Sequence, residues 1–442
     1  MQGNSFASAD PPVGRFFCGI LPRMKLSEIL KERGYVYQHS APLEEITDGK
    51  KRVLYLGVDP TADSMHVGQL QGLLVLRRFV DDGHKVIIVI GGGTGMVGDP
   101  GGKSAERNLL DDVTVVGNAR ALKAQFSTML GLVDFEMVNN ADWLHPLNYM
   151  EFLRDIGKHF TVNEMIKRDS VRPRIEAPDQ SISYTEFSYM LLQAYDFLQL
   201  HIEKKCDLQV GGSDQWGNIV SGVDLIRKKT GDTAYAFSWP LLVDKKTQKK
   251  FGKSEGNAVW LDATKTSPFQ FYQFWLNVED DMVEELLLKM TLLPRQEIDV
   301  VMESHHKSAA ERLAQKRLAR EVAKHVHGEG SANISWEISG TLFGGDLAGR
   351  NIETLSIEAL EKLKQEAPNC TVKLGDSIVD VVVAATLASS KREAKQFIED
   401  GAISLNGGKV TSTERVIMKE DFQNSPAAIL KRGKRNVSVL TL

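Results

Sequence analysis

The sequence predicts an α/β fold with a parallel sheet in its N-terminal half, followed by a helical region and a small α+β block. Three observations support this prediction. The runs RVLYLGVD at 52–59 and KVIIVI at 85–90 flank a helical stretch, and this order is typical of a right-handed parallel βαβ unit. Beyond Pro268 the apolar residues recur mostly at helical spacing. Near the C-terminus, Asn406-Gly407 is a strong hairpin signal.

Composition excludes several classes of protein. The chain has 442 residues, 42% hydrophobic and 25% charged, so about three globular domains are expected. No apolar run reaches the roughly 20 residues that a membrane-spanning helix needs. The cysteines Cys18, Cys206 and Cys370 lie far apart, which excludes a disulfide framework and a C-x-x-C zinc site. The net charge of -4 does not exclude nucleic acid, because basic residues can gather on one face.

The elements are expected in the following order. Residues 1–23 show little helical periodicity and are expected to be a disordered leader, a weak transit segment or an upstream start. Met24 opens the helix-like run MKLSEILKERG, and the βαβ unit follows. Further helices are predicted at 119–132, 148–160 and 185–201, and the strand CDLQVGG at 206–212 leads into another helix.

These elements divide the chain into parts. The α/β domain is predicted to span 24–245, and a helical domain with a lysine-rich loop at its start is predicted to span 246–328. The poorly periodic stretch 329–370 is predicted to be a linker, and residues 371–442 are predicted to form a separate small domain of two helices and a hairpin.

The glycine-rich stretch GGGTGMVGDPGGKS at 91–104 follows a predicted strand and suggests a phosphate site. Gly93, Gly95 and Gly98 fit the outline G-x-G-x-x-G of a dinucleotide site, but Asp99-Pro100 interrupts the expected helix start. A P-loop is excluded because only three residues separate Gly98 from Gly102. Neither template therefore explains the stretch.

Two stretches far apart in sequence carry the chemistry. YLGVDPTADSMHVGQL at 55–70 places His66 at a predicted helix start, and KKFGKSEGNAVWLD at 249–262 carries Lys250 and Lys253 in a loop. Alone, His66 could cap its own helix and the lysines could form a solvated surface loop. Together, in this order, the stretches resemble the H-x-G-H and K-M-S-K-S signatures of class I aminoacyl-tRNA synthetases. A helix N-terminus and mobile lysines both suit phosphate groups.

The stretches SYMLLQAYDFLQ at 188–199 and QVGGSDQWGNI at 209–219 narrow the resemblance. With the stretches above, they make residues 24–442 resemble bacterial-type tyrosyl-tRNA synthetases. The resemblance implies a Rossmann-like catalytic domain, an α-helical anticodon-binding domain and an S4-like RNA-binding domain. It also implies a homodimer that works in the cytoplasm or in an organelle matrix.

The resemblance implies a role for each site residue. The tyrosine-binding residues are Tyr55 and Asp196 at the substrate phenol, Asp99, Tyr189 and Gln193 at its ammonium group, and Gln215 as a further polar contact. The ATP-binding residues are Gly57, Asp59, Thr61, His66, Gly68, Gln69, Gly212, Asp214 and Lys253. The residues implied in catalysis are Thr61, His66, Gln69, Lys103, Arg107, Lys250 and Lys253, and no residue is implied as a metal ligand.

The implied reaction joins L-tyrosine to ATP, gives tyrosyl-adenylate and pyrophosphate, and then transfers tyrosine to tRNA(Tyr). ATP is a substrate, Mg²⁺ is expected to bind through the phosphates, and neither NAD nor zinc is expected. Basic residues at 312–324, 391–395 and 431–435 are expected to contact tRNA. One departure is visible, because Gln69 stands where the family more often has a second histidine. Gln69 can donate a hydrogen bond but cannot become cationic.

Three alternatives remain. A tryptophanyl-tRNA synthetase shares the fold and both signatures, but the S4-like block and the pair Tyr55 and Asp196 argue against it. A non-catalytic RNA-binding protein on the same fold would not need His66, Asp99 and the two loop lysines. A dinucleotide oxidoreductase would leave the lysine-rich loop without a purpose.

Overall fold

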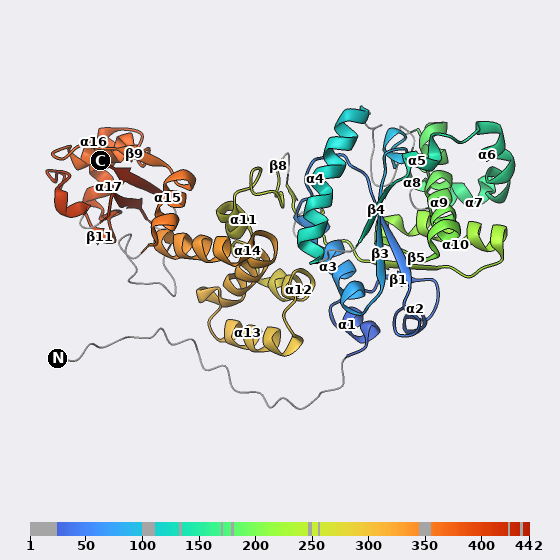
Figure 1. Cartoon of the computed structure of the whole chain (residues 1–442). Coiled ribbons are helices and arrows are strands. Elements are labelled where there is room, and N and C mark those ends of the chain that lie inside the picture. Colours follow the sequence, from blue (N-terminus) through green and yellow to red (C-terminus); the bar gives the residue numbers. More distant parts are fainter. Residues whose placement is uncertain are drawn as a thin grey trace.

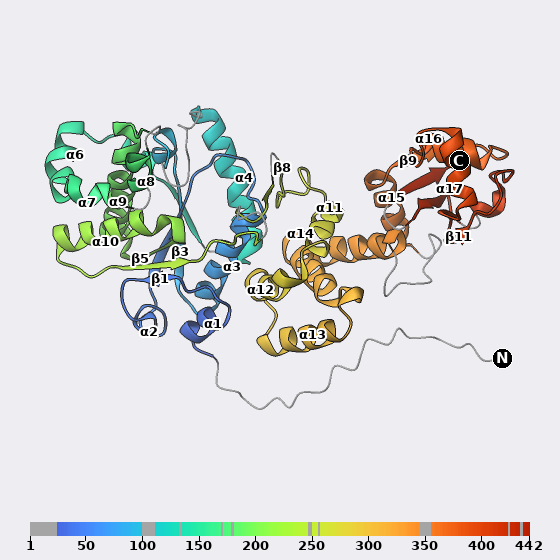
Figure 2. The same cartoon turned by 180° about the vertical axis from the view of Figure 1, so that it is seen from behind.

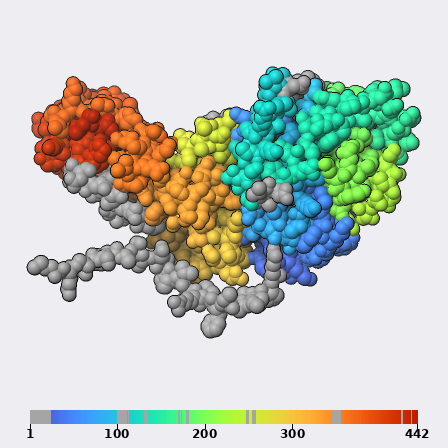
Figure 3. Space-filling view, viewed as in Figure 1, coloured from blue at the N-terminus to red at the C-terminus, as the bar shows by residue number. Residues whose placement is uncertain are grey.

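The computed structural model describes residues 24–99, 111–131, 135–168, 171–177, 181–245, 250–254, 257–343, 355–422, 425–433 and 436–442. Three parts follow one another along the molecule, an α/β part, a helical part and a C-terminal α+β part (Figure 1). The space-filling view shows the same elongated arrangement, with the α/β part and the C-terminal part at opposite ends (Figure 3). The three-part fold class predicted from the sequence is confirmed.

The α/β part is built on a six-stranded sheet with the order β1-β6-β5-β2-β3-β4. Its strands are β1 (Gln38–His39), β2 (Val53–Val58), β3 (Lys85–Ile90), β4 (Glu136–Asn139), β5 (Cys206–Gly212) and β6 (Tyr235–Trp239). All neighbours pair in parallel except β1 with β6. Residues 86–90 of β3 are all buried, as expected for a strand that is covered by helices on both faces.

Helices cover both faces of this sheet (Figure 2). One face packs against α1 (Leu26–Glu32), α3 (Val67–Asp81) and α4 (Asp112–Leu130), and the other packs against α9 (Tyr184–Lys204) and α10 (Trp216–Thr230). The shorter helices are α2 (Leu43–Thr47), α5 (Ala141–Leu144), α6 (Tyr149–Asp155), α7 (Val162–Ile166) and α8 (Arg172–Glu176). Within the described residues, no helix is long and apolar enough to cross a membrane.

The helical part consists of α11 (Pro268–Leu276), α12 (Asp280–Met290), α13 (Arg295–Lys307) and α14 (Leu313–Phe343). It is preceded by the short strands β7 (Lys253–Ser254) and β8 (Asn257–Ala258). Ser267 caps α11 and Pro268 occupies its first position, where the missing N–H costs no hydrogen bond. The apolar faces of these helices continue the core of the α/β part, so the two parts share one hydrophobic cluster.

The C-terminal part contains α15 (Ile357–Glu366), α16 (Ile378–Ala384) and α17 (Lys391–Glu399), with a five-stranded sheet of order β11-β10-β12-β13-β9. The strands are β9 (Asn369–Thr371), β10 (Ile403–Leu405), β11 (Gly408–Lys409), β12 (Ala427–Arg432) and β13 (Asn436–Thr441). Asn406 and Gly407 join β10 to β11 with φ values of 50° and 83°. Two positive φ values are typical of a type I′ turn, so the predicted hairpin is confirmed.

The prediction of a linker at 329–370 is wrong for much of this stretch. The helical backbone of α14 breaks at Gly328, where φ is 84°, but it resumes and runs to Phe343, and α15 begins at Ile357. Ile338 and Leu342 of α14 pack in one cluster with Leu360 and Ile429 of the C-terminal part. Small polar residues separate these apolar positions in α14, and this weakened the helical pattern. Packing against the C-terminal part supplies the stabilisation that the local sequence does not reveal.

Candidate active site

The site lies where the order of the strands reverses. From β2 the chain continues to β3 on one side, whereas β5 lies on the other side of β2. In open parallel sheets, ligands bind at such a point, beyond the carboxyl ends of the strands. A cavity of about 540 Å³ opens there, between the ends of β2 and β5, the start of α3 and one face of α9.

Most of the residues predicted to form the site line this one cavity. They are Tyr55, Gly57, Asp59, Thr61, His66, Gly68, Gln69, Asp99, Tyr189, Gln193, Asp196, Gly212, Asp214, Gln215 and Lys250. The backbone of Lys253 forms β7, but its side chain lies outside the described residues. Lys103 and Arg107 also lie outside them.

One end of the cavity is deeply buried. Tyr55 on β2 and Asp196 on α9 are 1% and 3% exposed. Burial raises the pKa of Asp196 to about 7, although hydrogen bonds from Asn140 and Trp143 oppose the shift. Burial, together with the nearby Asp196, raises the pKa of Tyr55 well above its usual value. A buried phenol and a buried carboxylate therefore line the same cavity, in surroundings that disfavour charge.

Three residues that line the cavity carry buried polar atoms for which the structure describes no partner. Within the described residues, the hydroxyl of Tyr55 and the Oε1 atoms of Gln193 and Gln209 are buried without a hydrogen-bond partner. A buried polar atom without a partner is destabilising by about 1–3 kcal/mol. Three such atoms around one cavity indicate a site whose hydrogen bonds are completed by a polar ligand.

The middle of the cavity carries an acidic and amide cluster. Gln215 Nε2 donates to Asp99 Oδ2 at 2.6 Å, and Gln193 Nε2 lies 3.4 Å from Gln215 Oε1. Asp99 is 8% exposed, so its carboxylate is held in place rather than solvated. Tyr189 lies one helical turn before Gln193 on α9 and lines the same cavity. The cluster suits a ligand cation of the size of an ammonium group.

Two supporting residues were missed from the sequence. Asn140 Nδ2 donates to Asp196 Oδ2 at 2.9 Å, and Trp143 Nε1 donates to Asp196 Oδ1 at 2.7 Å. Asn140 Oδ1 also accepts from the N–H of Gly93 at 2.8 Å, which ties the glycine-rich stretch to the same network. The strand β4 that precedes them was not predicted, and a polar residue directly after a parallel strand would have been the signal.

The opposite end of the cavity is the N-terminus of α3. His66 is its N-cap, and His66 Nδ1 accepts from the N–H of Gly68 at 3.1 Å. Gln69 Oε1 accepts from the N–H of His66 at 3.0 Å, which completes a capping box. The helix dipole at this end favours negative charge in the cavity. His66 therefore caps its own helix, as the simpler interpretation predicted, and also lines the cavity.

Glycine is required at position 68 because neighbouring atoms lie too close to leave room for a side chain. A Cβ atom at this position would lie 2.9 Å from the ring of His66 and 3.0 Å from the carbonyl of Phe251. The loop of the second signature therefore rests directly on the helix start that carries the first signature.

Lys250, a residue of the second signature, lines the rim of the cavity. Its Nζ lies 2.9 Å from Asp214 Oδ2, and the two side chains are 51% and 32% exposed. Because both groups are exposed, this ion pair contributes little to stability. The cation is available at the rim of the cavity, and its present partner is a residue that the resemblance assigns to ATP.

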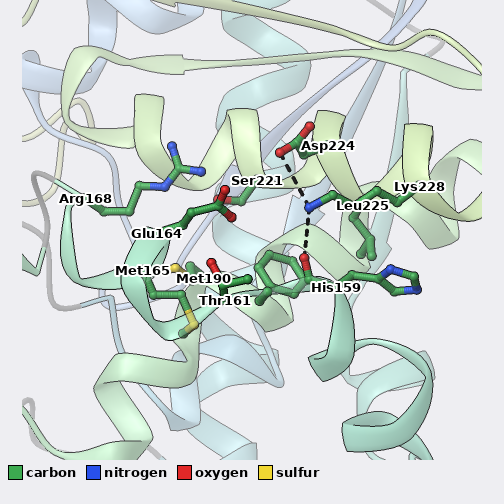
Figure 4. Close-up of a pocket in the computed structure, with 11 residues that line it drawn as sticks. His159, Thr161, Glu164, Met165, Arg168, Met190, Ser221, Asp224, Leu225 and Lys228 are labelled. Atoms are coloured by element: carbon green, nitrogen blue, oxygen red, sulfur yellow. Dashed lines mark hydrogen bonds and ion pairs between the residues drawn. The ribbon is translucent and has the colours of Figure 1, made fainter.

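A second pocket among the described residues is much smaller. Within the described ranges, no group of three His, Cys, Asp or Glu side chains could hold a metal ion. A pocket of about 10 Å³ lies between α7 and α10, which is room for about one water molecule. Figure 4 shows Lys228 between Asp224 and the carbonyl of His159 at this pocket, with an Nζ to carbonyl distance of 2.9 Å.

Several of the basic residues expected to contact tRNA have partners within the chain. Arg312 donates to the carbonyls of Leu276 and Val278, and Arg317 pairs with Glu297. Lys431 donates to the carbonyl of Thr341, and burial lowers its pKa. Arg392 and Lys395 on α17 are exposed, whereas residues 434 and 435 lie outside the described part. The exposed cations of α17 are therefore the better candidates.

Comparison with protein families gives two matches. Residues 47–344 match the model described as tRNA synthetases class I (W and Y). Residues 359–440 match the model described as Tyrosine–tRNA ligase SYY-like C-terminal domain.

Individual proteins agree with these matches. A Tyrosine–tRNA ligase from Streptococcus pyogenes is 43% identical over 427 residues, which cover 95% of this chain and all of that protein. A C-terminally truncated mitochondrial tyrosyl-tRNA synthetase from Aspergillus nidulans is 31% identical with a TM-score of 0.64, covering 73% of this chain and 95% of that one. A tryptophanyl-tRNA synthetase from Encephalitozoon cuniculi, at 17% identity and a TM-score of 0.50 over 71% of this chain and 89% of that one, shares the fold.

Proposed function

The chain belongs to the family of class I tRNA synthetases for tryptophan and tyrosine, and from this premise we propose that it is a tyrosine–tRNA ligase. It activates L-tyrosine with ATP to form tyrosyl-adenylate and pyrophosphate, and it then transfers tyrosine to the 3′ end of tRNA(Tyr). The observation that carries the choice of amino acid is the buried pair of Tyr55 and Asp196 at the closed end of the cavity.

This pair suits a phenol. The substrate hydroxyl donates to Asp196 and accepts from the Tyr55 hydroxyl, which has no other partner among the described residues. Phenylalanine would leave the Tyr55 hydroxyl without a partner and would deprive Asp196 of the donor that the substrate phenol supplies, which is costly in a buried site. Tryptophan places its N–H donor differently and offers no acceptor for the Tyr55 hydroxyl. Asn140 and Trp143 hold the Asp196 carboxylate in place.

The other groups orient the reacting atoms. Asp99, Tyr189 and Gln193 bind the substrate ammonium group, and Gln215 holds Asp99. The carboxylate of tyrosine then points toward the α-phosphate of ATP and attacks it in line, with pyrophosphate as the leaving group. No side-chain nucleophile takes part, so the rate depends on positioning and on stabilisation of charge.

ATP occupies the rim between the start of α3 and Asp214. Gly57, Asp59, Gly68 and Gly212 leave room for its ribose and adenine, while Thr61, His66 and Gln69 donate to its phosphates at the positive end of the helix. Lys250 and Lys253, with Lys103 and Arg107, neutralise the charge that develops on pyrophosphate. Mg²⁺ bound with ATP would supply further positive charge there.

Exchange of labelled pyrophosphate into ATP tests this function. The purified chain should catalyse exchange with tyrosine, and exchange with phenylalanine or tryptophan should be weaker by orders of magnitude. Exchange that depends on tryptophan would favour a tryptophanyl-tRNA synthetase. No exchange with any amino acid, together with tRNA binding, would favour a non-catalytic RNA-binding protein.

Recognition of tRNA is proposed for the helical and C-terminal parts. The exposed cations of α17 suit the RNA backbone, which is recognised largely by shape and charge. A chain that ends at residue 343 lacks α15 and β12, so the cut exposes Ile338 and Leu342 of α14, which pack against them. This shortened chain should retain pyrophosphate exchange and lose most tRNA charging, and equal loss of both activities would contradict the division of labour.

We further propose a homodimer that works where proteins are synthesised, in the cytoplasm or in an organelle matrix. Exposed apolar side chains gather on α6, α7 and the start of α9, and they include Tyr149 at 58%, Met150 at 69% and Val162 at 57% exposed. Patches of this kind are typical of interfaces. Met150→Asp should shift the chain toward monomer in light scattering, and an unchanged mass would contradict this surface as the interface.

A further inference from the structure

The loop at residues 59–66, which joins β2 to α3, carries Thr61 and His66 into the cavity and is here named the signature loop. It has no regular structure of its own, so its shape depends on contacts from neighbouring elements. Two amide side chains of α4 supply such contacts. Neither side chain was predicted as a site residue, and neither lines the cavity.

Asn118 and Gln125 form hydrogen bonds to residues near the two ends of the signature loop. Asn118 Nδ2 donates to the carbonyl of Pro60 at 2.7 Å, and both residues are buried. Gln125 Oε1 accepts from the N–H of Met65 at 2.8 Å, while its Nε2 donates to Ser64 Oγ at the same distance. The amide group provides both a donor and an acceptor, and Gln125 uses both.

The geometry of α4 allows both contacts at once. Positions 118 and 125 are two turns apart and share one face of the helix. Leu122 and Phe126, on the same side, are 2% and 0% exposed, so they anchor this face in the core. The amides are therefore presented to the loop from a helix that is itself fixed.

The backbone of Met65 also forms a hydrogen bond through its carbonyl. Its carbonyl accepts from the N–H of Leu261 at 2.8 Å, and the N–H of Val67 donates to the carbonyl of Val259 at 2.9 Å. The segment 258–261 follows the loop that carries Lys250 and Lys253. The residue directly before His66 is thus fixed between α4 and the segment that follows the lysine loop.

We propose that Asn118 and Gln125 are positioning residues for adenylate formation, acting through the signature loop. This inference rests on the proposed function. No hydrogen bond described here joins either amide to Tyr55, Asp99 or Asp196, so their removal should displace the phosphate-binding groups and leave the tyrosine pocket intact. The rate of the chemical step should fall while tyrosine affinity stays unchanged.

Gln125→Met in the full chain tests this proposal, because it keeps the length of the side chain and removes both hydrogen bonds. Tyrosine affinity is measured by calorimetry and adenylate formation by single-turnover kinetics. The rate should fall by about 10-fold to 100-fold, as expected when reacting groups are misplaced, with a dissociation constant for tyrosine within about twofold of the parent. Gln125→Glu keeps an acceptor for the Met65 N–H and should recover part of the rate.

Gln315→Met is the matched control. Gln315 is a fully buried glutamine on α14 that donates to Asp280, far from the signature loop in sequence. This variant should lose stability but keep the parent rate. If Gln125→Met does not fold, Ser64→Ala provides a second test, because it removes the Oγ atom that accepts from Gln125 Nε2. It should lower the rate of adenylate formation and leave the affinity for tyrosine unchanged.

The outcomes separate this proposal from the function it rests on. An unchanged rate in folded Gln125→Met, or an equal loss of tyrosine affinity, would overturn the positioning role alone. An equal loss of rate in Gln315→Met would also overturn it, because the effect would then be one of general stability. Absence of tyrosine-dependent exchange in the parent chain would overturn the proposed function and this proposal together.

Discussion

The two ends of the cavity differ in burial and in what holds their side chains. At the phenol end, Tyr55 and Asp196 are almost fully buried on a strand and a helix, and Asp196 accepts two hydrogen bonds from neighbours. At the nucleotide end, Lys250 is half exposed on a loop and pairs with Asp214 across the rim. The proposed function therefore assigns selection of the amino acid to the rigid core and stabilisation of the reaction to exposed, loop-borne groups.

This difference has a physical basis. A specific site for a small ligand gains from rigid, desolvated partners, because unpaired groups then penalise the wrong ligand. Groups that meet charge only during the reaction must remain able to move and to release pyrophosphate. The predictions below alter one end at a time, in order from the largest expected effect to the smallest.

The largest effect is expected from Asp196, in the pH dependence of stability. Burial raises its pKa in the folded state from the ordinary value of 3.8 to about 7, so the folded chain binds a proton more readily than the unfolded chain. The stabilising contribution of the neutral form is complete below pH 3.8 and is lost as the pH rises to about 7. A shift of about three units corresponds to about 4 kcal/mol.

Asp196→Asn should remove this dependence. The difference in free energy of unfolding between the variant and the parent, measured with denaturant from pH 4 to pH 8, should therefore grow with pH in favour of the variant. Taking the difference cancels the titration of all other carboxyl groups. A constant difference across this range would contradict a buried, neutral Asp196 in the ligand-free chain.

Lys250→Ala tests the nucleotide end. The variant loses the cation that we propose meets developing pyrophosphate charge, so the single-turnover rate of adenylate formation should fall by about 10²-fold to 10³-fold. Affinity for tyrosine should not change, because Lys250 does not contact the phenol end. Lys245→Ala is the matched control on the same stretch, since Lys245 donates to the carbonyl of Asp281. A rate that falls equally in both variants would contradict the assignment.

Tyr55→Phe tests the phenol end, because it removes only the hydroxyl group of the side chain. The ratio of kcat/KM for tyrosine to that for phenylalanine should narrow by about tenfold, because one of the two hydrogen bonds to the phenol is lost. The variant should also be more stable by about 1 kcal/mol, because the Tyr55 hydroxyl is buried without a partner among the described residues. Unchanged discrimination in pyrophosphate exchange would show that the phenol binds elsewhere.

The smallest effect is expected from Gln69→Glu, and it separates capping from catalysis. Glutamate keeps the acceptor for the His66 N–H and adds negative charge at a helix N-terminus, which stabilises by about 0.3–1 kcal/mol. The same charge faces the phosphates of ATP, so the adenylation rate should fall by about tenfold. A thermal melt measures the change in stability, and single-turnover kinetics on the same preparation measure the change in adenylation rate. A rise in stability with an unchanged rate would show that Gln69 serves the helix alone.

The sequence predicted the outline of the fold and much of the site, for identifiable reasons. The strands β2, β3 and β5 and the helices α3, α9 and α10 carry clear apolar patterns and turn signals. The roles of individual residues came from resemblance, because spacing alone cannot place β2 beside β5 or bring Tyr55 next to Asp196. The contact of Lys250 with Asp214 depends on the same long-range arrangement.

Other features could not be predicted because tertiary contacts decide them. Residues 329–343 form a helix through packing against the C-terminal part, which their weak periodicity did not indicate. Asn140 and Trp143 follow the short strand β4 and gain their role only from the neighbouring Asp196. Asn118 and Gln125 are ordinary polar positions of a helix until the signature loop lies against them.

Titration of L-tyrosine into the chain without ATP tests the central claim most directly. If selection is built into the closed end of the cavity, calorimetry should record saturable tyrosine binding in the absence of ATP. Lys250→Ala should give the same dissociation constant as the parent, and Tyr55→Phe should bind more weakly. Binding that requires ATP, or that is weakened as much by Lys250→Ala as by Tyr55→Phe, would contradict the division of labour between the two ends.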